Sequence, residues 1–118
     1  MKNISEWTLP ELENASQKLF VECGDVGASW AAAKATSESL EELKKVTIAR
    51  LKETFTGADN KREMDALATN QYSAYLDGLK KSKTEFYKLD STYKLLLKKI
   101  DFMQSVIVNR REELKKNM

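Results

Sequence analysis

The feature that most constrains the fold is the stretch from residue 61 to residue 116, which contains no proline and one glycine, Gly78. Apolar side chains recur along it at helical spacing, so that they share one face of an α-helix. The phase of this stripe is kept throughout, which predicts one continuous helix of about 80 Å. The stripe consists of Met64, Leu67, Ala68, Tyr72, Tyr75, Leu79, Phe86, Leu89, Tyr93, Leu96, Leu97, Ile100, Met103, Ile107 and Leu114.

A helical hairpin is the alternative for this stretch. Leu89 is followed by Asp90, Ser91 and Thr92, three residues that are good helix N-caps. The chain could therefore turn near residue 90 and form two shorter helices.

The residues upstream predict two further helices, over 8–23 and 28–55. Thr8 and Glu11 form a capping-box pattern with Pro10 in the first turn, which predicts where the first helix begins. Two glycines, Gly24 and Gly27, predict a turn or kink between the two helices. No strand signals are present. We therefore expect an all-α fold of three to four helices, in a single domain over residues 1–118.

The long stripe also predicts an oligomer. The remaining helices are too short to cover a continuous helix of that length, so part of the stripe needs another chain. The residues expected at the oligomer interface are Tyr93, Leu96, Ile100, Met103 and Ile107.

The composition argues against catalysis. The sequence has no histidine, which removes the commonest general base and metal ligand, and the single Cys23 has no imidazole partner. No glycine-rich phosphate loop and no zinc-binding spacing is found, so we expect neither a cofactor nor a metal. Without a signal sequence or an apolar run that could span a membrane, the expected location is the cytoplasm.

Charge is distributed unevenly along the chain. Residues 1–60 contain seven basic and ten acidic residues, whereas residues 61–118 contain thirteen and eight. An acidic half followed by a basic half is typical of a protein that binds a polyanion, or of head-to-tail pairing between copies. Chance is the alternative.

The lysines suit phosphate contacts, because ammonium groups along a helix bind the nucleic-acid backbone without sequence preference. Tyr87 lies off the apolar stripe and could stack on a base. Arg50 could hold a phosphate with its planar fork or pair with Glu53. The predicted nucleic-acid contacts are Lys44, Lys45, Arg50, Lys52, Lys61, Arg62, Lys80, Lys81, Lys83 and Tyr87.

Residues 44–112 resemble the UvsY-type recombination mediators of large bacteriophages. The similar features are the run IARLKETFTG at 48–57, KREM at 61–64, Tyr72, Tyr75, KLDSTY at 88–93 and a last apolar helix that ends at residues 109–111. The resemblance implies a helical, ring-like oligomer that binds single-stranded DNA. It also implies a role in loading a RecA-like recombinase onto strands coated by single-strand-binding protein. The family's basic contact falls on Arg50, and a second basic position falls on Ile48.

The leading hypothesis is therefore a non-enzymatic single-stranded DNA-binding protein of phage-type recombination, located in the bacterial host cytoplasm. One rival is a structural or adaptor oligomer whose apolar stripe binds partner helices. Another is a small helical inhibitor of a host nuclease, which would present its acidic half.

Overall fold

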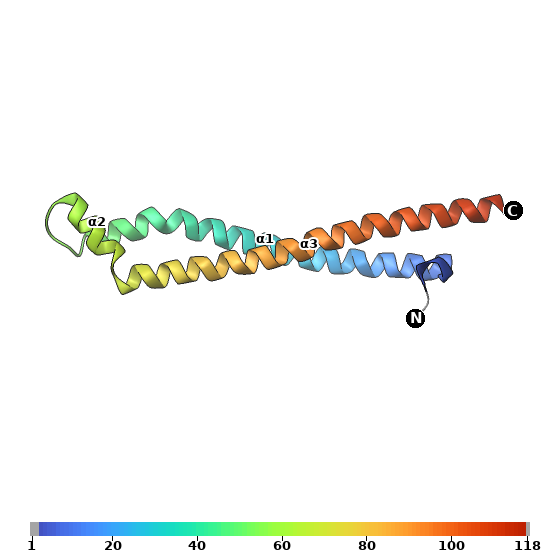
Figure 1. Ribbon diagram of the computed structural model, residues 1–118, viewed down its shortest axis with the longest axis horizontal. Coiled ribbons are helices and arrows are strands. Elements are labelled where there is room, and N and C mark those ends of the chain that lie inside the picture. The colour runs from blue at the N-terminus through green and yellow to red at the C-terminus, as the bar shows by residue number, and fades with distance from the viewer. Residues whose placement is uncertain (1–2, 118) are drawn as a thin grey trace. The chain divides into compact units, whose positions relative to one another are not determined.

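The structure, a computed structural model, describes residues 3–117, and these residues form helices without any strand. A short 3-10 helix, η1 (Ile4–Glu6), precedes three α-helices, namely α1 (Leu9–Lys52), α2 (Asp59–Leu67) and α3 (Asn70–Lys116) (Figure 1). The predicted all-α class is confirmed.

Helix α1 begins at the predicted capping box. The backbone N–H of Thr8 donates to Oε1 of Glu11 at 3.3 Å, and the backbone N–H of Glu11 donates to Oγ1 of Thr8 at 3.3 Å. Two backbone donors that the first helical turn leaves unpaired are satisfied in this way, which fixes the start of the helix.

The predicted turn between residues 23 and 28 is wrong, because α1 continues through it for 44 residues. Each glycine costs a helix about 1 kcal/mol. Cys23 and Val26 pack against Leu96 and Ile100 of α3, and this burial offsets the cost. The predicted helices 8–23 and 28–55 are therefore one helix, which ends at Lys52.

The predicted helix 61–116 is divided. Helix α2 ends at Leu67 and α3 starts at Asn70, with Thr69 between them. Oγ1 of Thr69 accepts a hydrogen bond from the N–H of Tyr72 at 3.1 Å, and therefore caps α3. No turn occurs near residue 90, where α3 continues and Lys94 pairs with Asp90 at 2.8 Å.

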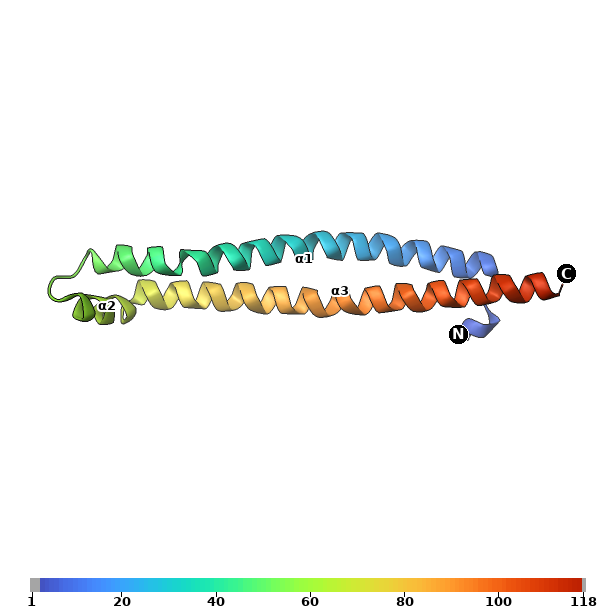
Figure 2. The same ribbon diagram turned by 90° about the horizontal axis from the view of Figure 1, so that it is seen from above.

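The described chain forms two compact units. The terminal unit combines the chain up to Ser29 with the chain from Asp90 onward, and the central unit is Trp30–Leu89. Within each unit a part of α1 lies beside a part of α3, running in the opposite direction (Figures 1 and 2).

The core of the terminal unit is a seam between α1 and α3. Leu12 packs with Met103 and Ile107, and Cys23 packs with Leu96 and Ile100. At the end of this seam, Arg110 donates hydrogen bonds to the carbonyl oxygens of Ser5 and Trp7, which fastens η1 to α3.

This packing changes the interpretation of the predicted oligomer interface. Leu96, Ile100, Met103 and Ile107 are buried within the chain, and the half-buried Tyr93 packs against them. The premise that one chain cannot cover the stripe is wrong here, because α1 is longer than expected and covers these five residues. They belong to the internal core.

The central unit is held together by aromatic and polar contacts. The rings of Trp30 and Phe86 lie 6.0 Å apart, and the hydroxyl of Tyr75 donates to the carbonyl oxygen of Leu40. Burial raises the pKa of Tyr75. Tyr72 and Ala66 are buried where α2 meets α3.

Candidate nucleic-acid interface

All ten predicted nucleic-acid contacts lie in the central unit. There, Lys83 of α3 reaches Glu41 of α1 at 2.5 Å, which marks one edge of the helix pair. Residues that line the adjacent pockets with these two, or that continue the face of Glu41 along α1 at four- and seven-residue spacing, share that edge. We call it the Tyr87 edge; its members are Lys34, Lys45, Ile48 and Lys52 of α1 and Leu76, Lys80, Lys83 and Tyr87 of α3.

Tyr87 is the exposed aromatic residue of this edge, with 62% of its surface accessible. Its ring lies 5.7 Å from that of Phe86, which supports it from the protein side. Lys80 and Lys83 follow the same face of α3 and line with Tyr87 a pocket of about 480 Å³. This arrangement places an aromatic face beside two ammonium groups.

Lys83 and Glu41 form an ion pair that connects α3 with α1 at this edge. The hydrogen bond to Glu41 raises the pKa of Lys83. Its ammonium group is already paired, whereas Lys80 is exposed on the same face. Lys80 is consequently the better candidate for a phosphate contact.

A second pocket, the turn pocket, lies where α1 meets α2 and has a volume of about 350 Å³. Lys45, Lys52 and Arg62 line it, together with Glu53 and Glu63. Asp59 joins two of the cations: its Oδ1 lies 2.6 Å from Nζ of Lys52 and 3.4 Å from a terminal nitrogen of Arg62. The hydrogen bond from Lys52 and the charges of both cations lower the pKa of Asp59.

Four predicted contacts lie outside these two groups. Arg50 follows Ile48 by two residues, which turns it by about 200° around α1, away from the Tyr87 edge. Lys81 is turned by about 100° from Lys80. The exposed Lys44 is turned by about 100° from Lys45, and Lys61 lies beside Gly57.

Lys34 was missed by sequence reasoning. Its Nζ lies 5.3 Å from the centre of the Trp30 ring, and the residue lines a pocket with Glu41, Lys83 and Tyr87. In the sequence it stands alone among alanines. The available signal was its position seven residues before Glu41, on the same face of α1.

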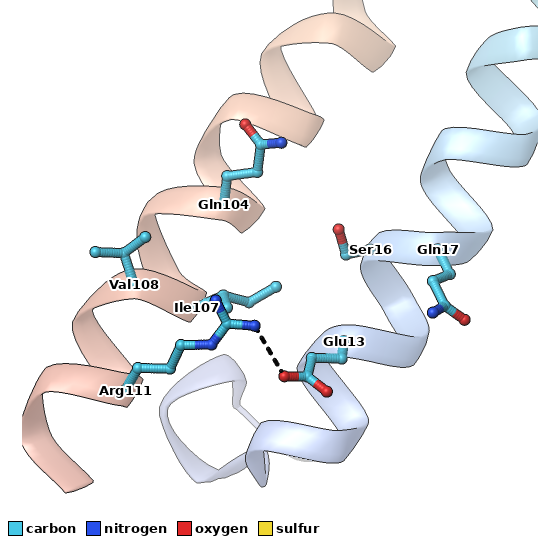
Figure 3. Close-up of a pocket in the computed structure, with 7 residues that line it drawn as sticks. All are labelled: Glu13, Ser16, Gln17, Gln104, Ile107, Val108 and Arg111. Carbon is cyan, nitrogen blue, oxygen red and sulfur yellow. Dashed lines mark hydrogen bonds and ion pairs between the residues drawn. The ribbon is translucent and has the colours of Figure 1, made fainter. Parts of the chain in front are cut away.

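The terminal unit contains a groove of about 600 Å³ beside Ser16 (Figure 3). Ser16 is a small residue in the α1–α3 seam, next to Ile107. Arg111 crosses from α3 to Glu13 of α1 at 3.1 Å and delimits the groove. The groove is lined mainly by polar residues and presents no strongly charged surface.

Among residues 3–117, no group of three or more acidic, histidine or cysteine residues is arranged to hold a metal ion. In the same part of the chain, no helix has an apolar stretch long enough to cross a membrane.

Comparison with family models, with curated proteins and with solved structures gave no match.

Proposed function

We propose that this protein binds single-stranded nucleic acid through the Tyr87 edge and acts by binding, without catalysis. The observation that supports this most is the exposed ring of Tyr87 beside Lys80 and Lys83 on one face of α3. An aromatic platform flanked by cations is the combination with which proteins bind single strands irrespective of sequence.

Each part of this edge has a distinct role in the proposal. The ring of Tyr87 stacks on an unpaired base, which contributes about 1–3 kcal/mol. Lys80 and Lys45 contact phosphates on one side of that base, and Lys34 contacts a phosphate on the other side. A duplex keeps its bases stacked on each other, so the ring favours single strands.

The resemblance to UvsY-type mediators supports a biological setting for this binding. We propose that the protein assists a RecA-like recombinase in displacing single-strand-binding protein from DNA. Both proteins are proposed partners, as is a second copy of the chain.

Lys80 and Lys81 provide a matched pair for testing the edge. Both are exposed neighbours on α3, but only Lys80 lies with Tyr87. We expect Lys80→Glu to weaken binding of a fluorescent oligothymidylate about tenfold, and Lys81→Glu to weaken it about two- to threefold through net charge alone. Fluorescence anisotropy over a salt series measures both. Equal losses would contradict a localised edge.

A second candidate function is that of an adaptor that binds partner helices. Phe102 and Leu95 of the terminal unit lie seven residues apart on α3 and are 58% and 53% exposed. Exposed apolar side chains at this spacing suit the face of another helix. A protein that associates through Phe102 but shows no salt-dependent affinity for single strands would favour the adaptor.

A further inference from the structure

The turn pocket contains a charge arrangement that a core-forming role does not explain. One carboxylate oxygen of Asp59 contacts both Lys52 and Arg62, and the Asp59 side chain is 66% exposed. Exposed ion pairs contribute little to stability, since solvent screens them. The bridge holds two cations close together at the rim of a pocket.

In this arrangement Arg62 uses only part of its hydrogen-bonding capacity. Its contact with Asp59, at 3.4 Å, involves one terminal nitrogen. Its Nε is buried without a hydrogen-bond partner, the only such side-chain atom found among residues 3–117. A buried donor without an acceptor is unfavourable, and arginine binds oxyanions best through two parallel N–H groups. A phosphate that displaces Asp59 and the side chains covering Nε would engage Nε and a terminal nitrogen together and so satisfy the fork.

Asp59 resembles a phosphate oxyanion in chemistry. Its carboxylate accepts hydrogen bonds from the two cations that a phosphate would contact, and it is attached to the first residue of α2. As an exposed side chain it can rotate into solvent. Glu53 and Glu63 at the rim disfavour a free anion, which suits a ligand anchored elsewhere on the protein.

We propose that Lys45, Lys52 and Arg62 form a binding site for a phosphate oxyanion of a nucleic-acid backbone, and that Asp59 occupies this site until the phosphate displaces it. The inference rests on the proposed function, because Tyr87 and Lys80 anchor the same strand along the Tyr87 edge. Asp59 lowers the affinity for every polyanion and therefore limits non-specific binding.

The test compares Asp59→Asn with Asp77→Asn. Asp77 is exposed on α3, and both variants remove one negative charge from the central unit. We expect Asp59→Asn to bind oligothymidylate about 3- to 10-fold more tightly than the wild type, and Asp77→Asn less than twofold. The salt slope of Asp59→Asn should be at least as steep as that of the wild type, because the phosphate contact forms without displacing a carboxylate from the two cations. Circular dichroism checks that the helices are retained.

The second part of the test uses a substitution of Arg62. In Asp59→Asn/Arg62→Ala the gain should disappear, since the phosphate loses its fork. An abasic oligomer of equal length should show the same gain from Asp59→Asn as oligothymidylate, because the site contacts phosphate and not base. Inorganic pyrophosphate tests whether the site instead binds a free phosphate compound. It should compete with oligothymidylate only weakly.

The outcomes separate the two proposals. If the wild type binds oligothymidylate but Asp59→Asn gains no more than Asp77→Asn, the turn-pocket site is wrong and the proposed function stands. If no variant binds the oligomer, the proposed function is wrong. Calorimetry with pyrophosphate then decides the site: binding to Asp59→Asn that is lost with Arg62→Ala supports a free-phosphate site, and no binding overturns it.

Discussion

Arg50 and Arg62 lie twelve positions apart in the sequence and on different sides of the central unit. The resemblance implies a DNA contact at Arg50, whereas our proposal places a phosphate contact at Arg62, which lines the turn pocket. Arginine to lysine keeps the charge but removes the planar fork, so each substitution tests for a formed site.

We predict that Arg62→Lys weakens binding of oligothymidylate by about 1–2 kcal/mol, or roughly 5- to 30-fold, and that Arg50→Lys has little effect. Anisotropy titrations of the two variants measure this, with circular dichroism to show that α1 and α2 are intact. The reverse order of effects would move the contact to the face predicted by the resemblance.

Tyr87 gives the second prediction at this scale. Because its ring is exposed and acts through its face, Tyr87→Ala should weaken single-strand binding by about 1–3 kcal/mol, while Tyr87→Phe should stay close to the wild type. Binding to duplex should change little in either variant. A loss in Tyr87→Phe equal to that in Tyr87→Ala would indicate that the hydroxyl, and not stacking, makes the contact.

At the level of single residues, the sequence predicted the exposure of Tyr87 correctly, because the residue falls off the apolar stripe. It could not predict which lysines share its edge. Lys34 and Glu41 reach Lys83 and Tyr87 only through the antiparallel pairing of α1 with α3, a contact between residues far apart in the chain.

The helices themselves show how local signals compete with tertiary contacts. The capping box of Thr8 depends on neighbours three residues apart and was predicted correctly. The glycines of α1 were misinterpreted, because the burial that offsets them comes from α3. The cap at Thr69 is also a local signal, but it was missed because the apolar stripe continues past it.

The two glycines of α1 differ in a way that can be measured. A Cβ at Gly24 would meet nothing within 4 Å, whereas one at Gly27 would lie 3.1 Å from the ring of Tyr93. Gly24→Ala should therefore stabilise the protein by about 1 kcal/mol. Gly27→Ala should gain less or destabilise, because the Tyr93 ring must move. Thermal unfolding followed by circular dichroism compares them; equal stabilisation would show that the ring moves freely.

Tyr75 links α1 and α3 and makes the stability of the central unit depend on pH. Its pKa is raised above 10.0, so the folded state keeps the proton to higher pH than the unfolded state does. The contribution is complete below pH 10 and is lost as the pH rises through the raised pKa.

We predict that the unfolding free energy of the wild type falls above pH 10, and that Tyr75→Phe falls less steeply over the same range. The Tyr75→Phe variant should also be about 1 kcal/mol less stable at pH 8, since it lacks the hydrogen bond to Leu40. Urea unfolding at pH 8, 10 and 11 measures both. Tyr87→Phe is the control, and a parallel loss in it would assign the slope to other groups.

Over the whole chain, the antiparallel pairing of α1 with α3 explains part of the charge asymmetry. The acidic first half meets the basic second half within each unit, as Glu13 meets Arg111 and Glu41 meets Lys83. Part of the basic charge from which a polyanion ligand was predicted is therefore neutralised by ion pairs within the chain. The sequence could not show this, because the prediction of three separate helices left the pairing open.

The predicted oligomer has to form through a surface other than the five α3 residues that the sequence indicated. The core residues of α3 are covered, but Phe102 and Leu95 are exposed on the terminal unit. We expect light scattering to give a multiple of the 13.5 kDa chain mass, and Phe102→Asp to shift the mass toward 13.5 kDa with helicity retained. Gln104→Asp adds the same charge on α3, about 200° around the helix from Phe102, and should not shift it. A wild-type mass of 13.5 kDa at micromolar concentration would contradict the prediction.

Cys23 gives the seam of the terminal unit a built-in reporter. Its thiol is free, buried and packed against Leu96 and Ile100, so an alkylating reagent reaches it only when α1 and α3 separate locally. The ratio of its labelling rate in the native protein to that in urea measures the free energy of this opening. Since no other cysteine is present, the kinetics have a single source and need no engineered label. Labelling with and without oligothymidylate then shows how far a strand bound to the central unit slows the opening of the terminal one.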